Sequence, residues 1–339
     1  MIIFRPIAQK DRDLFSYFAF DSLLGMTHFP KDPDRLESKI KLSEDSFLAK
    51  PERPGKEEYF FVLEDLITGR IGGIAGILAK NAINRSYFYK IETIPTHAQH
   101  FAAPKEMQIL MPITRGFHAS ELCSLYLQPS FRHSGQGRLL SLSRLLFIAA
   151  FKERFGHRVC AEMRGYVDQR QIAPFWENVG RHFCALSFVE LMNQLDEDKT
   201  FISEILPKFP LYVSLLSKEA QDVLGKTHDN TRAAFEMLRQ EGFVFQGEID
   251  LFDGGPLLNA KTSSIRTVKR SLLMRAEVTS ESLQDQEEWI VSNERIDFRA
   301  CKTRLQCLNS KVARIHREAA EALSIHSGSW IRIIAPVAG

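Results

Sequence analysis

The sequence has 339 residues, of which 44% are apolar and 25% are charged, and these proportions are typical of a globular protein with a sizeable core. The formal net charge of +2 argues against a surface built to bind nucleic acid or an anionic membrane. No apolar run approaches the roughly 20 residues of a membrane-spanning helix, and the five cysteines include no CxxC pair. We therefore expect a soluble, reduced, cytoplasmic protein with no metal site and no disulfide framework.

The first hundred residues predict the strands of an α/β domain. Residues 1–13 read as a strand followed by a helix start near Asp11. Two β-rich runs within 59–79 flank the turn pair Thr68-Gly69, which predicts a hairpin. A further strand is expected over 87–94, where apolar and polar residues partly alternate.

The stretch 121–155 predicts a strand, a short loop and a helix. ELCSLYLQ alternates in the manner of a strand, and Pro129 ends it. After the glycines, apolar residues recur at helical spacing through Phe155. The first N–H groups of a helix have no intrahelical partner and carry positive potential, so this order of elements can hold an anion at the loop.

The composition of the loop favours an anion site. Gly135 and Gly137 allow the backbone to approach a phosphate closely, Arg132 and Arg138 can add charge-assisted hydrogen bonds, and Ser134 can donate another. The alternative is a helix entry that only needs flexible residues. The spacing matches neither a Walker loop nor a dinucleotide-binding fingerprint.

The remainder of the chain predicts further elements and a domain boundary. RVCAEMRG (158–165) reads as a short buried strand, and 185–230 reads as mostly helical. Five basic residues and no acid fill 261–275, which we interpret as a solvated junction. We expect a catalytic domain over 1–260 and a small β-rich domain over 270–339.

The loop and its neighbours resemble the GNAT N-acyltransferase superfamily. There the motif R/Q-x-x-G-x-G/A lies between a strand and a helix and binds the pyrophosphate of a coenzyme A thioester; here it reads Arg132-His-Ser-Gly135-Gln-Gly137. The opening Arg5-Pro6 and the early hairpin also fit. This resemblance implies a mixed α/β fold whose sheet is mostly antiparallel around a splayed parallel pair.

Longer motifs resemble the arginine N-succinyltransferase family. They are SELCSLYLQPSFR, GQGRLLSLSRLLFIAAF, VCAEMRG, PFWENVG, EAQDVLGKTH and EGFVFQGEIDLFDGGP. The likeness is strong from about 120 to 260 and weaker in GMTHFP near the start. In SIHSGSWIRII near the end, Ser329 replaces the family's Asp. The resemblance implies a GNAT domain with a helical elaboration over 185–230 and a small C-terminal β-barrel-like domain.

The resemblance also implies the reaction. A member of this family would transfer a succinyl group from succinyl-CoA, as co-substrate, to the α-amino group of L-arginine in arginine catabolism, with no permanently bound cofactor. The alternatives are ornithine or another amino acid as acceptor, acetyl-CoA as donor, and a non-catalytic CoA-binding partner subunit. We expect no nucleic-acid or membrane partner, and either a homo-oligomer or a pairing with a related chain.

Catalytic and donor-binding residues follow from the matched motifs. VLGKTH places His228 at the family's proton donor, with Asp229 in place of the usual Pro. Glu121 opens the strand where some GNAT enzymes keep a general base; the alternative is an exposed strand-end carboxylate. The CoA-binding residues implied are the main chain of Leu125, together with Leu127, Arg132, Ser134, Gly135, Gln136, Gly137 and Arg138.

Candidates for binding the acceptor are less specific. Glu162 and Arg164 could form a carboxylate–guanidinium pair that grips an amino acid, or a buried salt bridge that only braces the fold. Thr27 in GMTHFP and Asp253 in FDGG are further candidates. His28 stands where the family has Ser, a change that could redirect specificity toward ornithine.

Overall fold

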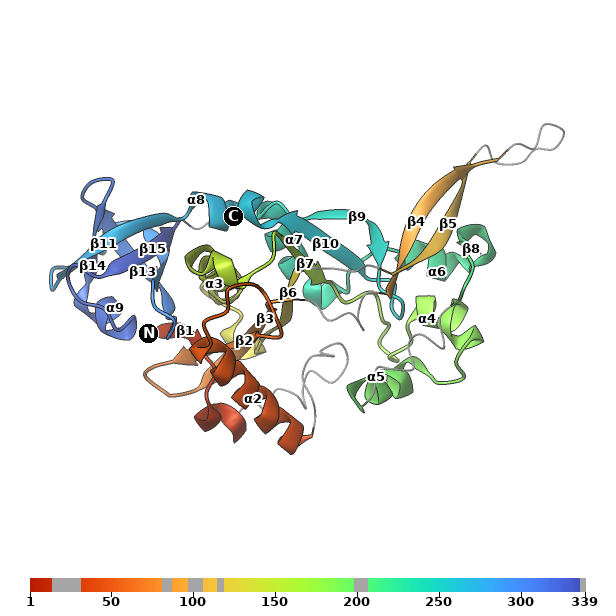
Figure 1. Cartoon of the computed structure of the whole chain (residues 1–339), viewed down its shortest axis with the longest axis horizontal. Coiled ribbons are helices and arrows are strands. Elements are labelled where there is room, and N and C mark those ends of the chain that lie inside the picture. The colour runs from red at the N-terminus through yellow and green to blue at the C-terminus, as the bar shows by residue number, and fades with distance from the viewer. Residues whose placement is uncertain (14–31, 81–86, 97–105, 115–118, 198–206, 336–339) are drawn as a thin grey trace.

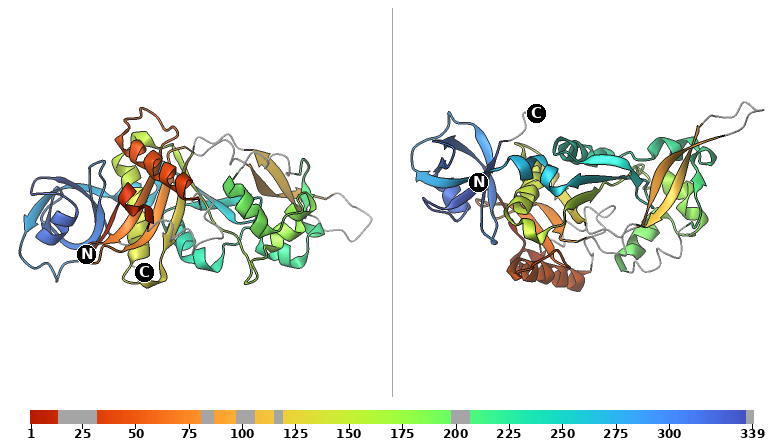
Figure 2. Two further views of the ribbon diagram at one scale, coloured as in Figure 1. Left: turned by 90° about the horizontal axis from the view of Figure 1, so that it is seen from below. Right: turned by 45° about the horizontal axis from the view of Figure 1, so that its top comes forward.

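The computed structural model describes residues 1–13, 32–80, 87–96, 106–114, 119–197 and 207–335. They form an elongated molecule, with the last strands of the chain at one end and a projecting hairpin at the other (Figures 1 and 2). None of the described helices is long and apolar enough to cross a membrane.

A mixed sheet forms the centre of the molecule. Its strands are, in spatial order, β1 (Ile2–Pro6), β2 (Glu58–Asp65), β3 (Ile71–Leu78), β6 (Ser120–Leu127), β7 (Arg158–Glu162), β10 (Pro256–Lys261) and β9 (Val244–Ile249). Strands β6 and β7 run parallel, and every other neighbouring pair in this set is antiparallel. The expected mixed α/β fold, mostly antiparallel around one parallel pair, is confirmed.

The predicted hairpin is formed by β2 and β3. Its turn includes Gly69, whose φ of 68° is a left-handed conformation that glycine adopts without steric cost. All eight residues of β3 are buried, because this strand has neighbours on both edges and layers on both faces. A central strand of this kind reads as a continuous apolar run rather than as an alternation.

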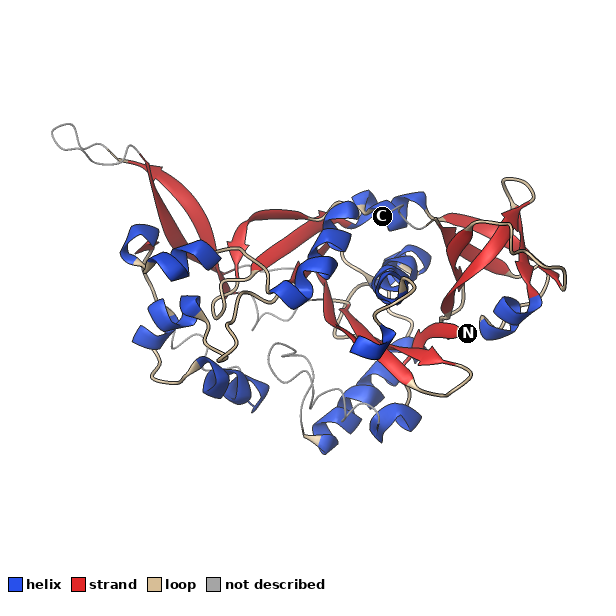
Figure 3. Ribbon diagram, turned by 180° about the vertical axis from the view of Figure 1, so that it is seen from behind, coloured by secondary structure: helices blue, strands red, loops and turns tan. Residues whose placement is uncertain are grey.

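A second antiparallel hairpin extends the sheet outward. Strands β4 (Tyr87–Pro95) and β5 (Glu106–Thr114) pair with each other, β4 also pairs with β9, and β5 pairs with the short β8 (Leu211–Tyr212). Short helices cover this region, as Figure 3 shows from behind. These helices are α4 (Pro174–Asn178), α5 (Phe188–Glu197) and α6 (Lys218–Val223).

The C-terminal strands close into a five-stranded barrel. They are β11 (Leu272–Thr279), β12 (Glu288–Asn293), β13 (Ala300–Cys307), β14 (Val312–His316) and β15 (Trp330–Ile334), joined by the helix α9 (Arg317–Ala322). Pairing of β12 with both β13 and β15 completes the ring. The expected β-barrel-like region is therefore present.

The barrel is continuous with the central sheet. Strand β13 pairs with β1 through Ile3 opposite Cys301 and Phe4 opposite Ala300. Between sheet and barrel, the helix α8 (Arg266–Arg270) buries Thr267 and Val268, so the basic junction is a packed helical turn as well as a charged surface. A domain division between residues 260 and 270 stays a proposal.

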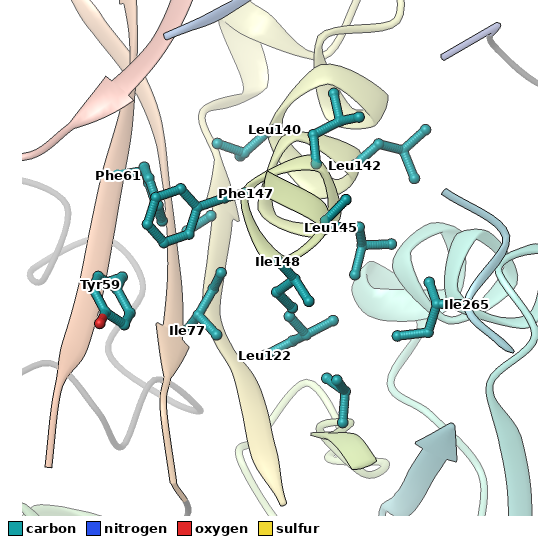
Figure 4. Close-up of a cluster of buried hydrophobic side chains, with 14 of the residues drawn as sticks. Tyr59, Phe61, Ile77, Leu122, Leu140, Leu142, Leu145, Phe147, Ile148 and Ile265 are labelled. Atoms are coloured by element: carbon teal, nitrogen blue, oxygen red, sulfur yellow. The ribbon is translucent and has the colours of Figure 1, made fainter. Parts of the chain in front are cut away.

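The helix α3 (Gln136–Ala150) organises the main core. It lies between the sheet and the barrel (Figure 1), contacting β3 and β6 on one side and β12 and β13 on the other. Phe147 lies against Phe61 of β2 (Figure 4). The rings that pack on Phe147 are those of Phe47, Tyr59, Phe61, Phe151, Phe155 and Phe298.

The helix is shorter than its apolar spacing predicts. It ends at Ala150, and a 3-10 turn over Lys152–Arg154 follows in place of the expected continuation to Phe155. Phe151 and Phe155 still pack on Phe147, so the turn keeps both rings in the core. Helical periodicity alone could not separate this turn from one more turn of α-helix.

Replacing Phe147 tests the role of this core. Because Phe147 is fully buried and contacts rings from the sheet, the helix α2 (Pro33–Leu48) and the barrel, Phe147→Ala should lower the free energy of unfolding by about 3–5 kcal/mol. Urea denaturation followed by circular dichroism measures this change. The control Phe209→Ala removes a ring that is 78% exposed and should change stability by no more than about 0.5 kcal/mol. Similar losses in both variants would contradict the assignment.

Candidate active site

The loop before α3 has the backbone of an anion site. Ser134 and Gly135 both have positive φ, 51° and 74°, and Gly135 is the N-cap of α3. Within the described part of the chain, no acceptor takes the N–H groups of Ser134, Gly135 or Gly137. Three unused donors at a helix N-terminus suit a phosphate.

Side chains of the loop support this geometry. Arg132 folds back so that its Nε donates to the Leu127 carbonyl over 3.0 Å, which ties the loop to the end of β6. A Cβ built on Gly137 would lie 3.8 Å from its nearest neighbour, the Leu127 side chain, so the protein's own packing has room for a side chain there. Gln136 and Arg138 occupy the first turn of α3.

Strands β6 and β7 separate to form a wedge. They pair only at Ser120 with Val159 and at Glu121 with Cys160. Beyond these pairs the strands diverge, so each presents an edge without the other as a neighbour. Leu125 on one arm and Arg164 on the other each stand four residues past the last pair. Counted along the sequence from the last pair, the two residues therefore mark the same level of the wedge, with Arg164 just past the end of β7.

A β-bulge on β6 marks the same level of the wedge. Cys123 pairs with Gly76 and Tyr126 with Ile74, so Ser124 and Leu125 together face a single residue of β3. Ser124 has a φ of 52°, an uncommon conformation for a residue with a side chain. Bulges interrupt the ladder and redirect the backbone, so Leu125 lies outside regular pairing on this edge too.

The other arm brings His228 to Arg164. The His228 N–H donates to the Arg164 carbonyl over 2.8 Å, and the neighbouring residues Thr227 and Gly165 form an isolated antiparallel bridge. These residues are more than 60 positions apart in sequence. The structure therefore places His228, the proton donor that the resemblance implies, next to Arg164 at the end of the β7 arm.

The hydrogen bonding of His228 defines its neutral tautomer. Its Nδ1 accepts the Asn230 N–H at 3.1 Å, so the ring proton of the neutral imidazole resides on Nε2. Burial lowers the pKa of His228 below its ordinary value, and the Arg164 cation lowers this pKa further. At neutral pH, His228 is thus a neutral ring that offers Nε2–H as a donor.

Asp253 organises the loops under this arm. Its Oδ2 accepts the Gly165 N–H at 2.7 Å, and its Oδ1 accepts the Gly255 N–H at 2.8 Å. Burial and the nearby Asp250 raise the pKa of Asp253 to about 7. Backbone N–H groups already bond to both carboxylate oxygens of Asp253. Holding these two loops together is therefore sufficient reason for an Asp at this position of FDGG.

Arg164 itself is a half-buried cation with unused donor capacity. Burial lowers its pKa, and its Nε is a buried donor with no acceptor. No described carboxylate lies within 4.0 Å of its guanidinium. Asp253 is the acidic group that attracts it. Neither the predicted pair with Glu162 nor a bracing salt bridge is seen in the described contacts of Arg164.

Other candidates take distinct positions. Glu121 is buried, at 1% exposure, and lies at the closed end of the wedge rather than on an exposed strand end. Glu162 is the last residue of β7. Burial, then the nearby Glu121, raises the pKa of the Cys123 thiol to about 12, so this cysteine stays protonated. Thr27 and His28 lie outside the described residues.

Two site features escaped the sequence interpretation. Ser124 carries no local signal for a bulge, because its conformation depends on how β6 pairs with β3. Arg144 is only 2% exposed and donates to the Cys123 carbonyl at 3.4 Å and to Ser141 Oγ at 3.2 Å. Burial lowers its pKa to about 10. The sequence signal that could have revealed this buried arginine is its isolated position in the apolar run SLSRLLFIAA.

Comparison with known proteins covers both parts of the chain. The family model described as "Arginine N-succinyltransferase beta subunit" matches residues 2–267, and the model of its C-terminal domain matches residues 274–335. Together these two matches span the whole central sheet and all of the barrel except the first two residues of β11.

Individual relatives agree with these models. Arginine N-succinyltransferase subunit alpha of Pseudomonas aeruginosa is 34% identical over 99% of this chain and 100% of its own length. The subunit beta from the same organism is 37% identical over 80% of this chain and 79% of its own length. The solved structure of arginine/ornithine succinyltransferase subunit AI from Pseudomonas aeruginosa superposes with a TM-score of 0.88 at 34% identity, covering 99% of this chain and 98% of that one. The chain belongs to the arginine N-succinyltransferase family.

Proposed function

We propose that this chain is an arginine N-succinyltransferase, which transfers the succinyl group of succinyl-CoA to the α-amino group of L-arginine. The observation that carries the proposal is the wedge, where β6 and β7 stop pairing after Glu121 and Cys160 and where the His228 N–H bonds to the Arg164 carbonyl. The loop before α3 adds three N–H groups that have no acceptor among the described residues. Full-length similarity to relatives that are named for this reaction supports it. Ornithine is the second candidate acceptor, because the similar subunit AI of Pseudomonas aeruginosa is named an arginine/ornithine succinyltransferase.

The wedge suits the steps of acyl transfer. The loop would hold the pyrophosphate, and the main chain of Leu125 would hold the thioester between the two arms. The neutral amine attacks the carbonyl carbon, the C–N bond forms, the C–S bond breaks, and the CoA thiolate leaves. His228 Nε2–H would donate a hydrogen bond to that sulfur as negative charge develops on it, and the proton lost by the attacking nitrogen would end on the sulfur, so that the amide and free CoA thiol form. Glu121 stays the second candidate for accepting that proton.

A thiol-release assay tests the proposed reaction. Purified protein is supplied with succinyl-CoA or acetyl-CoA as donor and with arginine, ornithine or lysine as acceptor. We expect fast release of CoA with succinyl-CoA and arginine. No turnover with any pair, despite CoA binding by calorimetry, would reject the enzyme and favour a non-catalytic CoA-binding subunit.

Replacement of His228 tests its role in proton transfer. His228→Ala should lower kcat by about 10²–10⁴-fold, the usual contribution of a positioned acid or base, while the Kd for CoA changes less than twofold. Steady-state kinetics and calorimetry measure the two effects.

The barrel provides a matched control. His316 caps α9 as His228 caps its own helical turn, since His316 Nδ1 accepts the Glu318 N–H. His316→Ala removes an equivalent cap far from the wedge and should leave kcat within twofold. Equal losses in both variants, or equal losses of kcat and CoA affinity in His228→Ala, would show that His228 acts only as a cap.

We further propose that Arg164 binds a substrate carboxylate. Its guanidinium is half-buried, has a buried donor without an acceptor, and has no carboxylate within ion-pair distance among the described residues. The Arg164 carbonyl also accepts the His228 N–H. Guanidinium groups bind carboxylates through parallel hydrogen bonds. The reaction supplies two such groups, the distal carboxylate of the succinyl moiety and the α-carboxylate of arginine.

Substrates that lack one of the two carboxylates show which of them Arg164 binds. Acetyl-CoA lacks the distal carboxylate, and agmatine is arginine without its α-carboxylate. In Arg164→Gln, the preference in kcat/KM for succinyl-CoA over acetyl-CoA, or for arginine over agmatine, should fall about 10–100-fold, the worth of a charged hydrogen bond. The ratio that falls identifies the carboxylate.

The control for this experiment is Arg170→Gln, which changes an exposed arginine near the same loop. Arg164→Gln also removes a cation that lowers the pKa of His228. That pKa should therefore rise when followed by NMR titration of the imidazole, which shows that the variant is folded and altered at the site. If both preferences stay within twofold of wild type, Arg164 binds no substrate carboxylate.

The names of two relatives bear on assembly. Two arginine N-succinyltransferase chains from one organism are named subunit alpha and subunit beta. We propose that this chain likewise forms a homo-oligomer or pairs with a related chain.

A further inference from the structure

Lys302 of the barrel reaches into the loop before α3. It lies on β13, and its Nζ donates to the Ser134 carbonyl over 2.7 Å. The side chain is only 16% exposed, and its ammonium also pairs with Glu288 of β12 at 2.6 Å. Glu288 of the barrel therefore fixes the ammonium group of Lys302, and this ammonium group in turn bonds to the loop.

The bonded carbonyl belongs to the strained part of the loop. Ser134 and Gly135 have φ values of 51° and 74°, and such conformations persist only where the surroundings hold them. The carbonyl of Ser134 and the N–H of Gly135 share one planar trans peptide unit, so they point in opposite directions. By fixing the carbonyl, Lys302 fixes the direction of the Gly135 N–H, one of the three unused donors.

The fit between lysine and loop leaves no room for a side chain. A Cβ built on Gly135 would lie 2.9 Å from Lys302 Nζ, closer than real Cβ contacts. Position 135 thus needs glycine for two reasons: the backbone is left-handed there, and the Lys302 ammonium group occupies the place of a Cβ. The glycine of the phosphate motif and a lysine 167 positions later, 302 against 135, form one unit.

We propose that Lys302 is a positioning residue for the pyrophosphate of the acyl-CoA, supplied by the C-terminal barrel. The barrel orients the phosphate loop through this lysine, and Glu288 keeps the ammonium in place. This inference rests on the proposed function only in naming the phosphate as that of CoA. It assigns the barrel a part in donor binding rather than in the chemistry of the wedge.

A donor without phosphates tests the proposal. S-succinylpantetheine carries the thioester but lacks the pyrophosphate that the loop would hold. In Lys302→Met, the KM for succinyl-CoA and the Kd for CoA should each rise about tenfold, the scale of one charge-assisted hydrogen bond. The kcat, the KM for arginine and the kcat/KM with S-succinylpantetheine should stay within twofold.

Further variants separate positioning from a general structural role. Lys302→Arg keeps a cationic donor and should restore most of the CoA affinity, and Glu288→Gln should weaken CoA binding less than Lys302→Met does. Lys311→Met, an exposed lysine of the same barrel, is the control and should behave as wild type. Equal losses with succinyl-CoA and S-succinylpantetheine would reveal a purely structural role and overturn the proposal, as would unchanged CoA affinity. If the wild type transfers no succinyl group, the proposed function fails, while the Kd for CoA still decides the role of Lys302.

Discussion

The separation of β6 from β7 after two residue pairs is the constraint on which the site depends. Two parallel strands that stayed paired would consume their facing backbone groups in a ladder and leave no opening. Because the pairing stops at Glu121 and Cys160, the chain gains two edges that face each other. The bulge at Ser124 releases the β6 edge from its other neighbour at the same level, so this row of the sheet has backbone to offer a ligand.

Burial of the surrounding elements compensates for this opening. The helix α3 fills the space between sheet and barrel with apolar side chains, and Phe298 brings the barrel into the same core through Phe4, Phe61 and Phe147. Arg144 carries a guanidinium under the diverging strands and bonds to the Cys123 carbonyl. The loop before α3 and the wedge are thus both supported by one continuous apolar core, which includes residues of α3, β6 and β7.

Electrostatics divide the wedge into two arms with different tasks. The β6 arm contributes backbone and a protonated thiol, whereas the β7 arm contributes the Arg164 cation and the neutral imidazole of His228. Arg164 adds to the burial that lowers the pKa of His228. Asp253, whose own pKa is raised to about 7, is the acidic group that attracts Arg164. Among the described residues Arg164 has no carboxylate within ion-pair distance, and it lies next to a neutral donor, so this arm suits an anionic group.

The sequence alone, through local patterns, determined several secondary-structure elements and the motifs of the candidate site. The strand–loop–helix order, Gly135 and Gly137, the hairpin at Gly69 and the motif that contains His228 are all short-range signals, because turns, caps and periodicity involve neighbours in the chain. Tertiary structure alone decided where β6 parts from β7, the contact of His228 with Arg164, the tautomer of His228, the bulge at Ser124, the 3-10 turn after Ala150 and the contact from Lys302. Each depends on strand register or on packing between segments far apart in sequence, which composition and spacing do not encode.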